Sequence, residues 1–305
     1  MIKDIVSNEK VKEFLSNELK LQKESGTYLF YGSDIELTLE FAISFSKGLC
    51  CEEIENDFCN ECNICRRIEN FSYSDLKIID NPDGITIDEI RELTEEVSKT
   101  SFEGRKKIFL IKDIGKMKKH SANALLKLIE EPNKNTYFML LNKDLNILPT
   151  IKSRCILVKI RLRTAEELGV DNFVYEFFRA DAKDIEEYKR TEIDIKQGYS
   201  YLDIKNAILD YLELQDIESK IKIYKAIRDF IRNKDYIKDV DKIYFAEEII
   251  DATSDKNILS EIIAYTVDVL KDRDKLEERL IKKQIFKIPI NIKLFLIDFF
   301  LNLWY

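Results

Sequence analysis

The sequence predicts an α/β fold with a mostly parallel sheet in its first half and an all-helical second half. Up to about residue 160, short apolar runs alternate with stretches of helical spacing, a pattern typical of strand–helix–strand units. Beyond Lys159 the three-to-four spacing continues, but the strand-like runs largely stop. The 305 residues include only 8 glycines and 4 prolines, too few for the many tight turns of an all-β sandwich or barrel.

Short apolar runs predict the strands of this sheet. Because helical stretches separate the runs, and parallel neighbours need a long crossover connection, we expect the strands to be mostly parallel. The runs are Tyr28–Tyr31, Leu76–Ile79, Ile108–Ile111, Tyr137–Leu141 and Ile156–Val158.

Helices are predicted between the strands and throughout the second half. Leu37–Leu49 carries an apolar stripe at every fourth position, Asp88–Lys99 continues the pattern, and Ser121–Glu131 ends directly before Pro132. Shorter helical runs are expected around 165–168, 173–178 and 185–188. The aromatic-rich segment Leu294–Tyr305, with Phe295, Phe299, Phe300 and Trp304, is predicted to be a buried helix.

The length of the chain predicts two domains, or three if some are small, and its composition divides it into three. Residues 1–162 would form the α/β domain, with a cysteine-rich module at about 50–65. The polar and charged stretch 163–205 would form a small helical domain, and residues 206–305 a helical C-terminal domain.

Charge and composition exclude several classes of function. The net charge is −8, so no global positive field draws the chain onto nucleic acid or an anionic membrane. The single histidine, His120, rules out a multi-histidine metal site and disfavours most hydrolase chemistry, and we expect it to be solvated at a helix start. The N-terminus is charged and lacks the apolar core of a signal peptide, and Leu294–Tyr305 is too short to span a bilayer. We therefore expect a cytoplasmic protein without membrane contact.

A cluster of cysteines predicts a structural zinc site. Cys59, Cys62 and Cys65 form two overlapping C-x2-C units, preceded by the adjacent pair Cys50 and Cys51. Four thiolates on short loops suit tetrahedral Zn²⁺, and a site filled by four protein ligands leaves no open position for catalysis. We choose Cys51 as the first ligand, with Cys50 as the alternative. Unbound reduced thiols and an iron–sulfur cluster are the competing interpretations.

The residues that bind ATP phosphates in a nucleotide-binding loop are missing. After the strand Tyr28–Tyr31, such a loop needs several glycines, a lysine and a hydroxyl for Mg²⁺. The chain has Gly32, Ser33 and then the carboxylate of Asp34. After Ile108–Ile111, where an acidic pair should hold the metal, it has Lys112 and Asp113. We therefore expect that this chain binds and hydrolyses no ATP by itself.

Within the first 160 residues, several sequence motifs are specific in combination. These are Ile108–Met117, Ser121-Ala-Asn-Ala-Leu-Leu-Lys-Leu-Ile-Glu-Glu-Pro132, Leu148–Cys155 with Ser153-Arg154-Cys155, Gly84–Arg91 and the cysteine module. In these motifs the chain resembles the bacterial clamp-loader family of DNA polymerase III, an AAA+ group with a P-loop-NTPase-type domain.

Within this family the chain is most similar to the delta-prime class, which has lost the phosphate loop. The resemblance implies a non-hydrolysing stator that places Arg154, flanked by Ser153, as an arginine finger against ATP on a neighbouring motor subunit. It also implies a small helical lid, a C-terminal collar domain, and a hetero-pentamer within the DNA-directed DNA polymerase III holoenzyme. That complex, with its motor and clamp-opening subunits, loads the sliding clamp onto primer-template DNA.

Some residues depart from the family pattern or remain open to other interpretations. Asn142 stands where motor subunits tend to have a threonine, and the spacing from Cys51 to Cys59 is one residue shorter than expected. The cationic cluster 105–119 could face DNA, a partner subunit or only solvent. Two alternative functions are an active clamp-loader ATPase with a divergent phosphate loop and a free-standing zinc protein that binds DNA.

Overall fold

The computed structural model describes residues 1–103, 106–270 and 291–303, which form two compact units, Met1–Glu167 and Leu168–Tyr305. The predicted division into three domains, with a boundary near residue 205, stays a prediction. Trp304 of the predicted C-terminal helix and residue 105, the first of the cationic cluster, lie outside the described residues.

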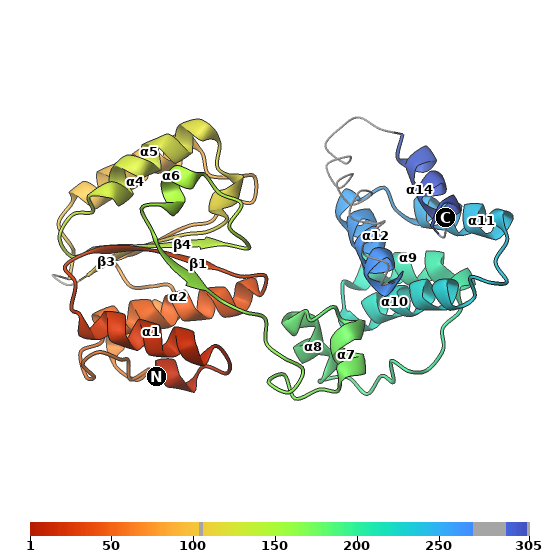
Figure 1. Ribbon diagram of the computed structural model, residues 1–305, viewed down its shortest axis with the longest axis horizontal. Coiled ribbons are helices and arrows are strands. Elements are labelled where there is room, and N and C mark those ends of the chain that lie inside the picture. The colour runs from red at the N-terminus through yellow and green to blue at the C-terminus, as the bar shows by residue number, and fades with distance from the viewer. Residues whose placement is uncertain (104–105, 271–290, 304–305) are drawn as a thin grey trace. The chain divides into compact units, whose positions relative to one another are not determined.

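The first unit alternates strands and helices along the chain (Figure 1). Its strands are β1 (Gly26–Tyr31), β2 (Leu76–Ile79), β3 (Lys107–Ile111), β4 (Thr136–Asn142) and β5 (Ile156–Lys159). Its helices are α1 (Glu9–Lys20), α2 (Ile35–Cys50), α3 (Asn63–Glu69), α4 (Ile87–Ser98), α5 (Lys119–Glu130) and α6 (Pro149–Lys152), with 3-10 turns at Ile2–Asp4 and Ile114–Lys116.

The five strands form one sheet in the order β2-β3-β4-β1-β5, and every pairing in it is parallel. The prediction of a parallel-sheet α/β fold is therefore confirmed. Alternate residues of a strand face opposite sides of the sheet. In β3, Ile108 and Leu110 join one buried cluster, while Phe109 and Ile111 join the other.

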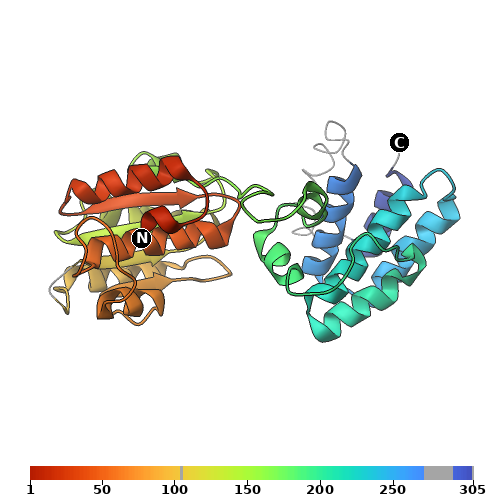
Figure 2. The ribbon, with the colours of Figure 1, turned by 90° about the horizontal axis from the view of Figure 1, so that it is seen from below.

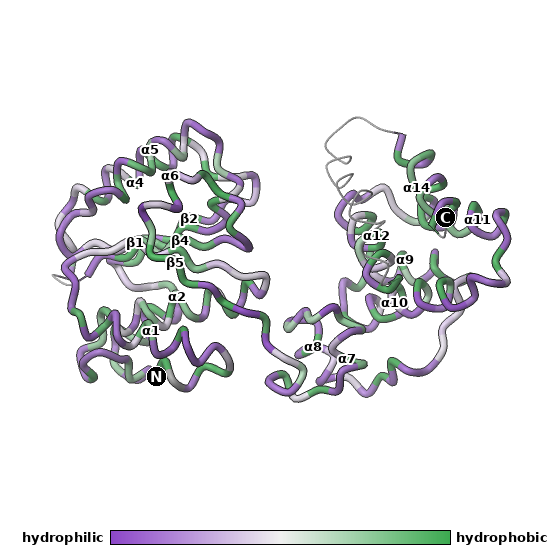
Figure 3. The backbone as a smooth tube through the Cα atoms, viewed as in Figure 1, coloured by the Kyte–Doolittle hydropathy of each residue, from purple (hydrophilic) through white to green (hydrophobic). Residues whose placement is uncertain are grey.

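Helices cover both faces of this sheet. α1 and α2 lie on one face and α4, α5 and α6 on the other (Figure 1). Helices that cover a sheet on one side carry an apolar stripe toward it and polar residues toward water, so their hydropathy alternates along the chain (Figure 3). In α4 the buried stripe is Ile90, Leu93 and Val97.

The predicted strands all lie within the observed ones, and the three predicted helices agree with α2, α4 and α5 to within two residues. Helices α1, α3 and α6 were not predicted. The helical run expected around 165–168 is wrong, because these residues form a turn. There the Glu167 carboxylate accepts the Thr164 backbone N–H and pairs with Arg161, and these contacts stabilise a turn rather than a helix.

The second unit is helical in its described part and has one continuous apolar core (Figures 1 and 2). Its helices are α7 (Asn172–Phe177), α8 (Ala182–Tyr188), α9 (Ile204–Leu214), α10 (Ile217–Arg232), α11 (Asp239–Ala252), α12 (Lys256–Leu270) and α14 (Ile292–Leu301), with a 3-10 turn at Tyr201–Asp203. Phe300 of α14 is fully buried, whereas Leu294 is exposed, so the predicted C-terminal helix is buried along one face only. Within the described ranges, no helix has the length and apolar character needed to cross a membrane.

Candidate functional site

The cysteine module follows the C-terminal end of α2. Cys51 comes directly after the last residue of that helix, and Cys59 lies in the loop that follows. Cys62 is the N-cap of α3, where its Sγ accepts the backbone N–H of Cys65, 3.4 Å away. This capping contact places Cys65 in the first turn of α3 with its side chain buried.

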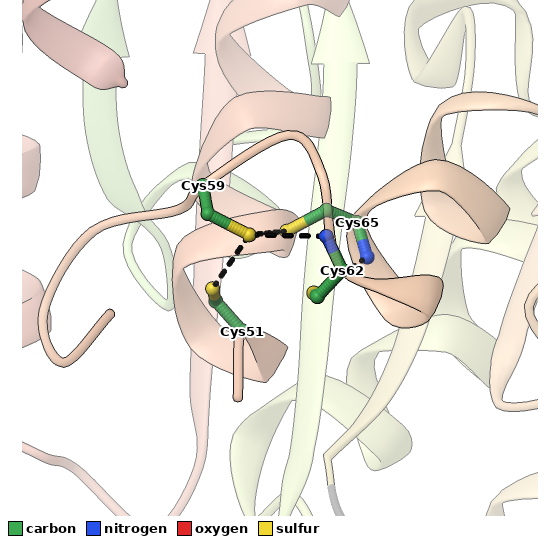
Figure 4. Close-up of side chains that lie close together, drawn as sticks. All are labelled: Cys51, Cys59, Cys62 and Cys65. Atoms are coloured by element: carbon green, nitrogen blue, oxygen red, sulfur yellow. Dashed lines mark hydrogen bonds between the residues drawn. The ribbon is translucent and has the colours of Figure 1, made fainter. Parts of the chain in front are cut away.

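The sulfur atoms of Cys51, Cys59, Cys62 and Cys65 all lie within 4.8 Å of one another (Figure 4). The Sγ atoms of Cys51 and Cys59 are 3.7 Å apart, and those of Cys59 and Cys65 are 4.0 Å apart. A tetrahedral ion with Zn–S bonds of about 2.3 Å requires sulfur atoms about 3.8 Å apart. The donor set and its spacing therefore fit a structural metal ion of the zinc type.

The surroundings of the cluster favour thiolates on its exposed side. Backbone N–H groups of Cys62 and Glu61 donate to the Cys59 sulfur and lower the pKa of that thiol to about 7, against the effect of desolvation. Burial raises the pKa of Cys65, so this thiol needs a cation to ionise. Cys50, the alternative first ligand, lies outside the cluster, with its sulfur 3.9 Å from the carbonyl oxygen of Lys106.

Lys47 attaches the module to α2. Its side chain is only 6% exposed, and its ammonium group donates to Asn60 and Glu69 and lies over the ring of Phe58. Phe58 and Asn60 belong to the module and Glu69 is the last residue of α3, so one buried cation joins both to α2. Burial lowers the pKa of Lys47.

Asp34 lies at the N-terminus of α2, in the segment where the sequence predicts a degraded nucleotide-binding loop. It is the N-cap of α2, and its Oδ1 accepts the backbone N–H of Leu37 at 3.0 Å. Its Oδ2 lies 3.0 Å from Nε of Arg163, and the Asp34 side chain is only 5% exposed. A helix N-terminus attracts anions through its free N–H groups and its dipole. Here the anion is a carboxylate of the chain itself, neutralised by an arginine.

Of the other residues predicted at a nucleotide site, Gly32, Lys112 and Asp113 also make close contacts within the chain. A Cβ atom at Gly32 would lie 2.3 Å from the carbonyl oxygen of Ile160, so glycine is required by the close approach of the segment after β5. Ser33 is exposed. Lys112 pairs with Asp80 at 2.8 Å, and Asp113 pairs with Lys116.

Arg154 lies just after α6, with its side chain about one third exposed. One terminal nitrogen donates to the carbonyl oxygen of Thr150 at 3.1 Å, and the other lies 2.8 Å from Oε1 of Glu130. Ser153 Oγ donates to the same Thr150 carbonyl. Cys155 is partly buried, and burial raises its pKa to about 12, which agrees with a small apolar role.

The basic cluster 105–119 does not form one cationic surface in its described part. Lys107 is buried and donates to the carbonyl oxygens of Glu96 and Lys99. Lys118 and Lys119 are exposed. His120 is exposed in the first turn of α5, as predicted.

The sequence analysis did not assign roles to Arg163 or Glu130. Glu130 belongs to the Glu-Glu-Pro motif quoted above, but nothing local indicates that it reaches Arg154. Arg163 contacts a residue 129 positions earlier, so no short-range pattern could identify the pair.

Comparisons with known proteins find similarity to subunits of DNA polymerase III. The family model described as "DNA polymerase III, delta subunit" matches residues 7–164. The chain is 37% identical over 149 residues to DNA polymerase III subunit delta' of Bacillus subtilis. This alignment covers 48% of this chain and 45% of that protein. It is 35% identical over 167 residues to DNA polymerase III subunit tau of Escherichia coli, covering 54% of this chain and 26% of that protein. The matched regions thus span less than half of either relative.

Among solved structures, the chain is similar to a DNA polymerase III gamma subunit-related protein of Thermotoga maritima, with a TM-score of 0.59. The alignment covers 95% of this chain and 97% of that one, at 17% sequence identity. At this identity the similarity establishes a shared fold.

Proposed function

Because the chain belongs to the DNA polymerase III clamp-loader family, we propose that it is a delta-prime-like subunit, a stator that hydrolyses no ATP itself. Its partners would be the motor and clamp-opening subunits of a hetero-pentamer in the cytoplasm. Through that complex it would help to load the sliding clamp onto primer-template DNA. Residues 163–205 would form the lid and 206–305 the collar, and Zn²⁺ would hold the cysteine module.

The observation that carries the stator role is the Asp34 carboxylate at the N-terminus of α2. An ATP phosphate placed there would meet a fixed negative charge and would have to displace the pairing with Arg163. The cation that would compensate is also absent from the loop, since Gly32, Ser33 and Asp34 include no lysine. Both features disfavour the alternative of an active ATPase.

Arg154 gives such a subunit a catalytic role in a neighbouring site. A guanidinium is planar and always charged, so it stabilises the charge that develops on a transferring γ-phosphoryl group. The partial exposure of the Arg154 side chain at the end of a short helix suits contact with a partner subunit.

The test is ATP turnover in a complex reconstituted with motor subunits. We expect Arg154→Ala to lower turnover by about tenfold or more, because the finger acts on the transition state. Lys152→Ala is the matched control, since Lys152 is exposed in the same turn and should leave turnover unchanged. Equal assembly of all variants must be verified by size-exclusion chromatography.

An Arg154→Ala complex with wild-type turnover would contradict the finger. ATP binding by the isolated chain would instead support an active ATPase. Salt-dependent affinity of the isolated chain for primer-template DNA would support the free-standing DNA-binding protein.

A further inference from the structure

We infer that Glu130 holds the Arg154 guanidinium in a resting position on its own subunit, so that the finger must exchange this carboxylate for phosphate. The inference rests on the proposed function and adds a positioning residue to it. Glu130 is the last residue of α5, and Arg154 follows α6, so the pair joins two elements on one face of the sheet.

The resting position leaves the guanidinium incompletely paired. Its terminal nitrogens donate to Glu130 and to the Thr150 carbonyl, whereas Nε is buried without a hydrogen-bond partner in the described part of the chain. A buried donor without an acceptor is unfavourable. Turning toward the oxygens of a phosphate would supply acceptors that the resting position lacks.

The pair is also weak enough to exchange. The Glu130 side chain is 56% exposed and that of Arg154 is 32% exposed, so solvent screens their attraction. At 2.8 Å, however, the carboxylate still cancels much of the positive charge that an approaching phosphate would meet. Glu130 thus competes with the phosphate for the finger without preventing its use.

The experiment measures turnover of the reconstituted complex at saturating ATP without DNA. Because Glu130→Gln keeps the side-chain shape and removes the charge, we expect turnover to rise about two- to fivefold, the scale of an exposed ion pair. The increase should fall on kcat, with KM for ATP nearly unchanged, because the finger acts in the transition state. Glu131→Gln, the exposed neighbour at the end of α5, is the matched control.

The double variant Glu130→Gln/Arg154→Ala decides whether Glu130 acts through Arg154. It should have the same turnover as Arg154→Ala alone, since no finger remains to be released. An unchanged or lower turnover in Glu130→Gln, or the same increase in the Arg154→Ala background, would overturn the inference. Wild-type turnover in Arg154→Ala would instead contradict the proposed role of Arg154 as the finger. The two single variants therefore distinguish a failure of the proposed function from a failure of this inference.

Discussion

Cys62→Ser is expected to lose the metal ion and to lower the free energy of unfolding of the first unit on the order of 5 kcal/mol. A serine hydroxyl is a poor ligand for zinc, but serine is a good N-cap. The capping of α3 by residue 62 is therefore preserved, and the loss reports the missing thiolate. Metal content by elemental analysis should fall from about one ion per chain to none.

Cys50→Ser is the control for this prediction, since Cys50 is a buried neighbour of Cys51 that lies outside the sulfur cluster. It should keep its metal ion. Full metal content and unchanged unfolding in Cys62→Ser would contradict the zinc site. Strong visible absorption of the purified chain would indicate an iron–sulfur cluster instead.

Lys220→Met is expected to lower the free energy of unfolding of the second unit by about 3 kcal/mol. In α10, Lys220 Nζ lies 2.7 Å from Oδ2 of Asp184 in α8 and 2.9 Å from Oε1 of Glu261 in α12. The Asp184 side chain is only 10% exposed. Removing the lysine leaves the Asp184 carboxylate desolvated and without its neutralising cation. Glu261, in contrast, still accepts a hydrogen bond from the hydroxyl of Tyr224.

Lys222→Met in the same helix provides the comparison. Lys222 pairs with Asp210, but both side chains are about 40% exposed, so its loss should cost about 0–1 kcal/mol. Chemical denaturation monitored by circular dichroism measures both values. Equal losses in the two variants would contradict a special role for the buried pair.

The effect of Lys220→Met should depend on pH. Burial already raises the pKa of Asp184, and loss of the ammonium group would raise it further. A carboxyl whose folded-state pKa is raised binds its proton more tightly in the folded chain. The loss of unfolding free energy in Lys220→Met is therefore fully present above the folded-state pKa of Asp184. It disappears as the pH falls from that value to the pKa of the unfolded chain, about 4. A difference from wild type that stays constant between pH 7 and pH 4 would indicate lost packing instead.

The features that were predictable from the sequence are those encoded by short-range patterns. Strands such as Leu76–Ile79 are short runs rich in apolar residues. The four cysteines lie between residues 51 and 65, so their spacing alone predicts that their sulfur atoms come together. Helix α1 also has a short-range signal, since Val11, Leu15 and Leu19 are spaced four residues apart.

Pairs formed across the fold were not predictable. Asp34 and Arg163 meet only because β1 and β5 are neighbours in the sheet, which brings the segments that follow them together. Lys220 joins three helices whose packing no local pattern specifies. The sequence predicts a degraded phosphate loop, but it does not predict that Asp34 pairs with Arg163 at the N-terminus of α2.

The strand order of the sheet has a consequence for synthesis on the ribosome. β1 is made first, yet its two neighbours are β4 and β5, and Gly26 pairs with Tyr137. Such distant pairing is slow, and β1 keeps unpaired edges until residues 136–159 have emerged. The four cysteines lie between residues 51 and 65 and can gather around an ion long before that. In the nascent chain the cysteine module can thus be complete before β1 gains either neighbour, and the edge strand β5 is added last.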